Sequence, residues 1–204
     1  MKREVQDNAL PVPVLPMAFF DMAGVNDSEH ELATFPSFQK AFEHFNHRIL
    51  LLGEPRSGKT TTLMSFARDS VWKRLENSRL PLPIIVPVAT WDAELEQSME
   101  SWLGSTVAAL KDDIDTLLRD RNLLLILDGL DELGSIRENA LTGQSYDPRE
   151  RFLDILSHHH QIVLSCRVNE YEELNRKTTL SGAVRLQPLD DVQLREYLRD
   201  MPEL

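Results

Sequence analysis

The sequence predicts an α/β domain in which helices cover both faces of a five-stranded, mainly parallel sheet, giving three layers. Two observations lead to this fold class. Short aliphatic runs alternate with helical patterns along most of the chain, and this alternation is typical of parallel strands joined by right-handed crossovers. The runs are apolar throughout, which is typical of strands that are buried on both faces.

The strands are expected inside a single domain that spans residues 35–188. Residues 1–34 combine prolines with a polar run, so we expect an irregular N-terminal segment or linker there. Residues 189–204 are expected to begin a following helical region. Five strands are expected at residues 49–52, 84–88, 123–127, 162–164 and 183–186.

Helical patterns separate the expected strands. Phenylalanines at helical spacing predict a short helix near residues 35–45, and an amphipathic pattern predicts another at residues 58–75. A longer pattern at residues 95–118 is expected to break at Gly104. Asp147 is expected to cap a helix whose first residue is a proline.

Composition excludes several classes of protein. The chain has 204 residues, of which 42% are hydrophobic and 27% charged, and its net charge is −11. An acidic balance argues against binding to the phosphate backbone of nucleic acids. With one cysteine there is no internal disulfide, and no apolar run approaches the ~20 residues of a membrane-spanning helix. We therefore expect a cytoplasmic protein without a membrane segment or a nucleic-acid partner.

The most informative motif follows the first of these strands. The segment GEPRSGKT matches G-x-x-x-x-G-K-[ST] in full and stands between an apolar strand and an amphipathic helix. Such a loop points successive backbone N–H groups at phosphate oxygens, at the positive end of the helix. Lys59 adds a charge for the β and γ phosphates, and Thr60 offers a hydroxyl to Mg²⁺. Nucleotide contacts are expected from Gly53, Glu54, Pro55, Arg56, Ser57, Gly58, Lys59, Thr60 and Thr61.

Two further motifs follow later strands. Asp128 stands where a buried strand ends, which suits a carboxylate that holds Mg²⁺ beside the loop. Asp131 and Glu132 follow, and a carboxylate there could deprotonate an attacking water; the alternative is a solvated acidic turn. Arg167 follows another strand and is always charged, so it could bind a transferring phosphate; the alternative is a surface arginine.

Together these segments resemble the NACHT group of signal-transduction P-loop ATPases, which belong to the STAND class, and bacterial members most of all. The motifs read GEPRSGKT, ILDGLDEL and LSCRVNEY, and the stretches PLPIIVPVATW and VRLQPLDDVQLREYL are also similar to the family. The resemblance covers about residues 35–200. It implies that the arginine-bearing strand lies between the P-loop strand and the acidic strand.

The resemblance also implies roles for individual residues. Lys59, Thr60 and Asp128 would handle phosphate and Mg²⁺, and Asp131 and Glu132 would supply the catalytic carboxylate. Among the remaining residues, Arg167 would sense the γ-phosphate and Pro188 would lie against the base. The implied cofactors are ATP or ADP with Mg²⁺, with GTP as the alternative nucleotide. The implied function is a switch from a closed ADP-bound form to an open, self-associating ATP-bound form, which in bacteria serves antiviral or conflict signalling.

Two departures from the family pattern bear on this expectation. Arg56 replaces a glycine, and if that position has a positive φ the replacement costs about 1–2 kcal/mol. The family continues into helical, winged-helix and sensor parts, so we expect the switch to be incomplete, and the protein mostly monomeric, with these 204 residues alone.

We therefore expect binding and slow hydrolysis of a nucleoside triphosphate, preferentially ATP. Slow turnover is expected because no arginine finger is evident in the chain, and such a group is worth roughly 10³–10⁵ in rate. One alternative is a catalytically weak, nucleotide-gated scaffold for oligomerisation or partner binding. A nucleic-acid-dependent motor or a small-molecule kinase is another, but neither a basic track nor an acceptor pocket with a lid is evident.

Overall fold

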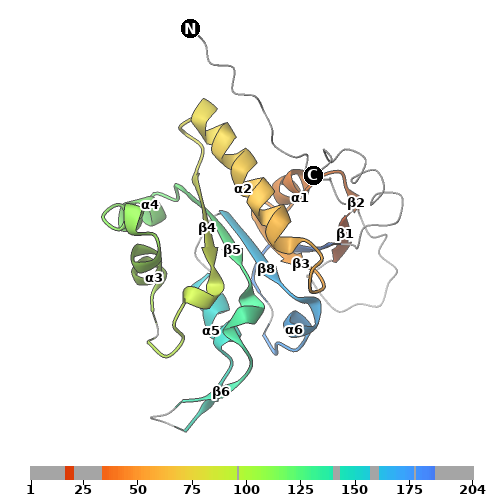
Figure 1. Cartoon of the computed structure of the whole chain (residues 1–204), viewed down its shortest axis with the longest axis vertical. Helices are drawn as coiled ribbons and strands as arrows, with labels where there is room; N and C mark the ends of the chain where they lie inside the picture. The colour runs from red at the N-terminus through yellow and green to blue at the C-terminus, as the bar shows by residue number, and fades with distance from the viewer. Residues whose placement is uncertain are drawn as a thin grey trace, which may run out of the picture.

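The fold is built on one twisted sheet (Figure 1). The computed structural model describes residues 17–20, 34–95, 97–139, 143–156, 161–176 and 178–186. Five neighbouring strands of the sheet are parallel, as expected. The order across the sheet is β2 (Thr34–Phe35), β1 (Met17–Phe20), β9 (Gly182–Leu186), β3 (Arg48–Leu52), β8 (Gln161–Cys166), β5 (Leu123–Asp128) and β4 (Leu82–Pro87). Strand β8, which leads to Arg167, therefore lies between the P-loop strand β3 and the acidic strand β5, as the resemblance implied.

Strands β1 and β2 are additional to the expected five. Strand β1 pairs with β9 in antiparallel register, with Met17 opposite Leu186 and Phe20 opposite Ala183. The expectation of an irregular segment is therefore wrong for residues 17–20. Four residues are too few to show a strand period, and their pairing depends on an open edge of β9 that is distant in sequence.

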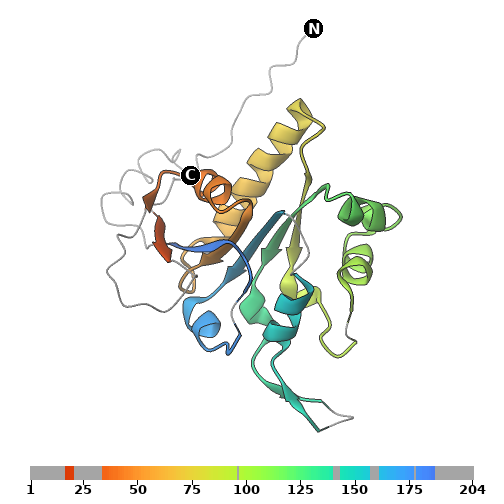
Figure 2. The same cartoon turned by 180° about the vertical axis from the view of Figure 1, so that it is seen from behind.

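Helices cover both faces of the sheet, which confirms the three-layer prediction (Figures 1 and 2). Side chains alternate along the buried strand β5: Leu124 and Ile126 pack in the core formed with α1 and α2, whereas Leu125 and Leu127 pack on the opposite side with α3, α4 and α5. Within the described ranges, no helix combines the length and apolarity needed to cross a membrane. The helices are α1 (Phe38–His44), α2 (Lys59–Glu76), α3 (Met99–Thr106), α4 (Ile114–Arg119), α5 (Pro148–Ile155) and α6 (Val168–Glu172).

Short elements complete the fold. They are the 3₁₀ turns η1 (Val88–Thr90), η2 (Ala108–Leu110) and η3 (Leu130–Leu133), and the hairpin of β6 (Arg137–Glu138) with β7 (Ser145–Tyr146).

The helical segment is interrupted as expected, but the break comes after Thr106 and not at Gly104. Helix α3 continues through it to Thr106. Trp102 and Leu103 are fully buried, and that burial outweighs the roughly 1 kcal/mol that a glycine costs inside a helix. A Cβ at Gly104 would lie 3.6 Å from Ile114 Cγ2, so the glycine faces the start of α4.

Strand β4 is an edge of the described sheet and carries prolines at particular positions. Leu82 N donates to Asn122 O at 2.8 Å, so the even-numbered N–H groups of β4 point toward β5. The outward-pointing positions are Pro83, Ile85 and Pro87, and prolines have no N–H. Only Ile85 therefore offers a backbone donor along this edge.

Candidate functional site

The loop between β3 and α2 is curled as a phosphate-binding loop requires. Gly58 caps α2 with φ 93, in the left-handed region that favours glycine. A Cβ at Gly53 would lie 2.5 Å from Ser57 Oγ, so a larger residue there would displace the Ser57 hydroxyl. Ser57 N donates to Glu54 O at 3.1 Å and closes the turn. The loop therefore ends at the N-terminus of an 18-residue helix, where backbone N–H groups attract anions.

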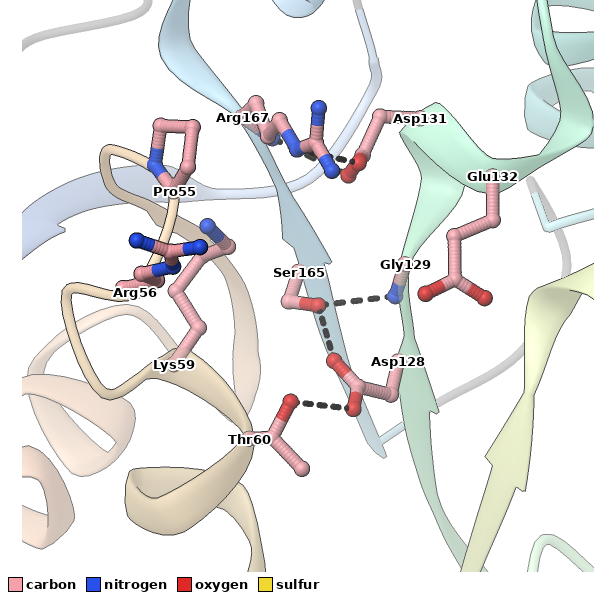
Figure 3. A pocket seen from close by; sticks show the side chains of 10 residues that line it. All are labelled: Pro55, Arg56, Lys59, Thr60, Asp128, Gly129, Asp131, Glu132, Ser165 and Arg167. Atoms are coloured by element: carbon pink, nitrogen blue, oxygen red, sulfur yellow. Dashed lines mark hydrogen bonds and ion pairs between the residues drawn. The ribbon is translucent and has the colours of Figure 1, made fainter.

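Arg56 occupies a strained position in this loop. Its φ is 63, so position 56 does have the positive φ considered above. A non-glycine residue there costs about 1–2 kcal/mol of stability. The loop nevertheless keeps its curl, and the Arg56 side chain is exposed at the mouth of the cavity beside Lys59 (Figure 3).

A chain of hydrogen bonds joins the P-loop helix to the acidic strand. The Thr60 hydroxyl donates to Asp128 Oδ2 at 2.8 Å. Ser165 Oγ donates to the other oxygen, Oδ1, at 2.6 Å and accepts from Gly129 N at 2.8 Å (Figure 3). Ser165 is fully buried, so this network fixes the Asp128 carboxylate beside Thr60. The two expected Mg²⁺ ligands therefore lie together.

Sequence reasoning did not identify Ser165. The available signal was a hydroxyl residue at the end of the aliphatic run Ile162–Leu164, where a buried polar side chain needs a partner. That partner comes from the neighbouring strand, which the sequence does not specify.

Asp131 and Arg167 form an ion pair at the carboxyl ends of β5 and β8. Arg167 Nε lies 3.0 Å from Asp131 Oδ2, and Arg167 N donates to Oδ1 at 3.1 Å. The Asp131 side chain is 7% exposed, against 45% for Arg167. Glu170 adds a contact of 3.3 Å to Arg167 Nη1. Both oxygens of the Asp131 carboxylate are therefore engaged.

Glu132 presents its carboxylate to the same cavity. A Cβ at Gly129 would lie 2.8 Å from Glu132 Cδ, and Gly129 has φ 83, so a glycine here leaves room for that side chain. Desolvation of the carboxylate, followed by the negative charges of Asp128 and Asp131, raises the pKa of Glu132 above its ordinary value. Arg167 opposes this effect without cancelling it. Glu132 therefore holds its proton to a higher pH than an ordinary glutamate does.

Lys59 is held against the loop itself. Its Nζ donates to Gly53 O at 2.8 Å and to Glu54 O at 3.1 Å. The Glu54 side chain in turn pairs with Arg185 of β9 at 2.9 Å. The ammonium group therefore lies inside the curl of the loop.

The described residues leave a cavity of about 550 Å³ at this edge of the sheet, within the range of small-molecule sites. It lies at the carboxyl ends of the parallel strands, where ligands bind in open α/β sheets. Its lining residues are Pro55, Arg56, Lys59, Thr60, Asp128, Gly129, Asp131, Glu132, Ser165 and Arg167 (Figure 3).

The lining suits a polyphosphate with Mg²⁺. Ser57 Oγ is buried and has no hydrogen-bond partner among the described residues, so the loop holds a polar group that a ligand could satisfy. Nowhere in the described ranges do three His, Cys, Asp or Glu residues gather around a possible metal position. Mg²⁺ is ordinarily held by one or two carboxylates together with substrate phosphates, so Asp128 and Thr60 fit that role.

Not all predicted contact residues line the cavity; those of the loop that do not are Gly53, Glu54, Ser57 and Gly58. Thr61 is exposed on the first turn of α2 and is absent from the cavity lining. Pro188, the expected neighbour of the base, lies outside the described residues, as does the expected helix near residue 190.

Cys166 is a packing residue. It is fully buried behind the site, and burial raises the pKa of its thiol to about 12. A thiol in that state is a poor nucleophile at neutral pH.

The chain is similar to known proteins in sequence and in structure. No curated protein matches the chain. Among solved structures, the Aeropyrum pernix Orc1 protein in complex with DNA is 22% identical, with 74% of this chain and 42% of that chain covered and a TM-score of 0.47. The chain thus spans less than half the length of that structure. A family model described as NACHT domain matches residues 47–203, most of the chain. The chain therefore belongs to the NACHT family of P-loop NTPases.

Proposed function

We propose that this chain binds a nucleoside triphosphate, preferentially ATP, with Mg²⁺ and hydrolyses it slowly as the nucleotide switch of a signalling protein. The observation that carries the proposal is the 2.8 Å hydrogen bond between Thr60 and Asp128. It brings a P-loop hydroxyl and a strand-end carboxylate together beside the cavity, as Mg²⁺ binding needs.

The loop and its lysine would bind the phosphates. Backbone N–H groups of residues 53–60 and the start of α2 would face the β-phosphate oxygens. Lys59 would exchange its two carbonyl partners for the β and γ phosphates, because a charged oxygen is a stronger acceptor than a carbonyl. Thr60 and Asp128 would hold Mg²⁺, which neutralises phosphate charge when bound.

Glu132 is the better candidate for the catalytic base. Both oxygens of Asp131 are engaged by Arg167, whereas Glu132 reaches the cavity from the adjacent position. Its raised pKa suits a group that takes a proton from water. In this assignment Asp131 positions Arg167 and Glu132 accepts the proton.

Slow turnover follows from the state of Arg167. Two carboxylates hold its guanidinium, so it must leave at least one of them to reach a transferring phosphate. An arginine that is free to contact the transferring phosphate raises the rate by roughly 10³–10⁵. Arg167 must first give up an ion pair, and the free energy of that loss reduces the gain in rate. We infer that further parts of the protein or a second copy control the release of Arg167 from these carboxylates. We place this switch in a bacterial signalling role, with self-association of the ATP-bound form.

A titration tests the binding step. Isothermal calorimetry with ATP, ADP and GTP in the presence of Mg²⁺ should give Lys59-dependent binding, with Lys59→Ala at least roughly tenfold weaker. Lys73→Ala, on an exposed position of the same helix, is the matched control and should bind as the wild type does. If the two variants bound nucleotide equally well, the loop would not be the phosphate-binding site.

A phosphate-release assay then separates an NTPase from a catalytically weak scaffold. The NTPase should release phosphate in a Mg²⁺-dependent manner, and nucleic acid should not stimulate it, because the chain carries a net charge of −11. Binding without release would favour the scaffold.

A further inference from the structure

The cations that line the cavity differ in whether they already have partners. Arg167 is paired with Asp131 and Glu170, and Lys59 donates to two carbonyl oxygens of its own loop. Arg56 lines the same cavity, yet its side chain forms no hydrogen bond or ion pair with any residue in the described ranges. Among the described residues that line the cavity, Arg56 is therefore the cation that can meet an anion without first losing a partner.

The backbone of Arg56 makes its presence costly. Its φ of 63 lies in the left-handed region, where glycine would fit without strain. The Arg56 side chain comes from the loop side of the cavity, whose lining it shares with Lys59 and with Asp128 and Ser165 from the strand ends (Figure 3). The arginine thus adds a guanidinium group to the cavity lining, at the cost of backbone strain that a glycine would avoid.

The opposite wall of the cavity is acidic. Asp128, Asp131 and Glu132 line it, with Arg167 as the one cation of that wall. A triphosphate brings more negative charge toward these carboxylates than a diphosphate does. An unpaired cation on the loop side offsets that repulsion mainly for the longer polyphosphate.

We infer that the Arg56 guanidinium binds the terminal phosphate of a nucleoside triphosphate and so makes the site prefer triphosphate to diphosphate. The inference rests on the proposed function, because it concerns the ligand of that same site. Guanidinium suits the contact, since it is always charged and can bind two oxygens at once. The contact forms in the bound state before hydrolysis, so it raises affinity and leaves the rate of the chemical step to other residues.

Binding measurements on the full chain test this role. Calorimetry with Mg²⁺ compares ADP and a non-hydrolysable ATP analogue on wild type, Arg56→Gly and Arg56→Lys. Arg56→Gly should weaken the ATP analogue roughly ten- to a hundredfold and change ADP by less than about threefold. Arg56→Lys should fall between, because lysine keeps the charge and loses the two-pronged contact.

Arg121 provides a matched control. It has φ 57 and lies before β5, at the opposite end of that strand from the cavity. Arg121→Gly makes the same exchange in the same backbone region and should leave both affinities unchanged.

The outcomes separate the inference from the proposed function. If Arg56→Gly lowers the affinity for the ATP analogue but not that for ADP, the inference is supported. Equal loss for both nucleotides, unchanged binding or tighter binding overturns it, while Lys59-dependent binding of the wild type still supports the proposed function. If the wild type binds neither nucleotide, both are overturned.

Discussion

Thr60 and Asp128 are 68 positions apart in the chain, and the hydroxyl of the first donates a hydrogen bond to the carboxylate of the second. The contact links the first turn of α2 to the last residue of β5. It brings together two oxygen atoms of the kind that hard cations prefer as ligands.

The first prediction concerns Asp128. Asp128→Asn keeps the shape of the side chain and replaces one acceptor oxygen with an amide donor. We expect the gain in ATP affinity that Mg²⁺ provides to fall by roughly 10–100-fold, while metal-free binding changes little. Calorimetry at several Mg²⁺ concentrations measures this gain. The same gain in both proteins would exclude Asp128 as a metal ligand.

Ser165 should matter for stability as well as for the site. Ser165→Ala removes the donor to Asp128 and leaves the Gly129 N–H without its acceptor. We expect a loss of about 1–3 kcal/mol in the free energy of unfolding, because a buried group is left unsatisfied. Urea denaturation checks it. Ser70→Ala, which removes only a hydroxyl bonded to the preceding turn of α2, should cost much less.

The two neighbouring acids should behave differently in hydrolysis. Glu132→Gln should lower the rate of phosphate release by roughly 10²–10⁴-fold, whereas Asp131→Asn should lower it by less than about tenfold. Asparagine can still accept from the Arg167 backbone through one oxygen. If Asp131→Asn lowered the rate of phosphate release as much as Glu132→Gln does, Asp131 would be the general base.

The same assignment sets the sign of the pH dependence. A general base works only when it is deprotonated, so wild-type activity should fall as pH drops through the pKa of Glu132. That pKa lies above its ordinary value of 4.5. The fall should therefore begin at a higher pH than for an ordinary glutamate. A rate that increases on acidification in this range would contradict the assignment.

Stability in acid should depend on the Asp147–Arg149 pair. Arg149 Nη2 lies 2.7 Å from Asp147 Oδ2, and the two side chains are 4% and 8% exposed, respectively. Burial alone would raise the pKa of Asp147, but hydrogen bonds from Arg149 and its charge together lower it below 3.8. The pair's contribution is thus complete above pH ~4 and is lost as pH falls through the lowered value.

Variants of this pair test the point by urea unfolding. Asp147→Asn should cost about 3–5 kcal/mol at neutral pH and reduce the sensitivity to acid. Asp69→Asn breaks the exposed pair with Arg68, whose side chains are 41% and 53% exposed, and should cost under about 1 kcal/mol. Similar losses in the two variants would mean that burial of the Asp147 pair adds nothing.

The sequence predicted those parts of the fold in which local pattern and tertiary burial agree. The five aliphatic runs became parallel strands, and Asp147 caps α5 as expected. The P-loop was predicted from a spacing that reflects a local backbone requirement, and Asp128 from its position at the end of a buried strand. Strand β1 was missed because its pairing with β9 is entirely non-local.

The division of roles within the site needed coordinates. Adjacent acids in a sequence carry no sign of which one will be neutralised. Only the juxtaposition of β5 and β8 shows that Asp131 is engaged by Arg167 and Glu132 is not. At Gly104 the local signal predicted the break two residues too early, because the buried neighbours Trp102 and Leu103 keep the helix continuous as far as Thr106.

The prolines of β4 have a consequence for crowding. An open sheet edge is where molecules at high local concentration begin uncontrolled strand pairing. Pro83 and Pro87 leave one outward donor at Ile85, too few for a continuous ladder with another chain. The β4 edge therefore resists strand addition by another chain, even where the local protein concentration is high.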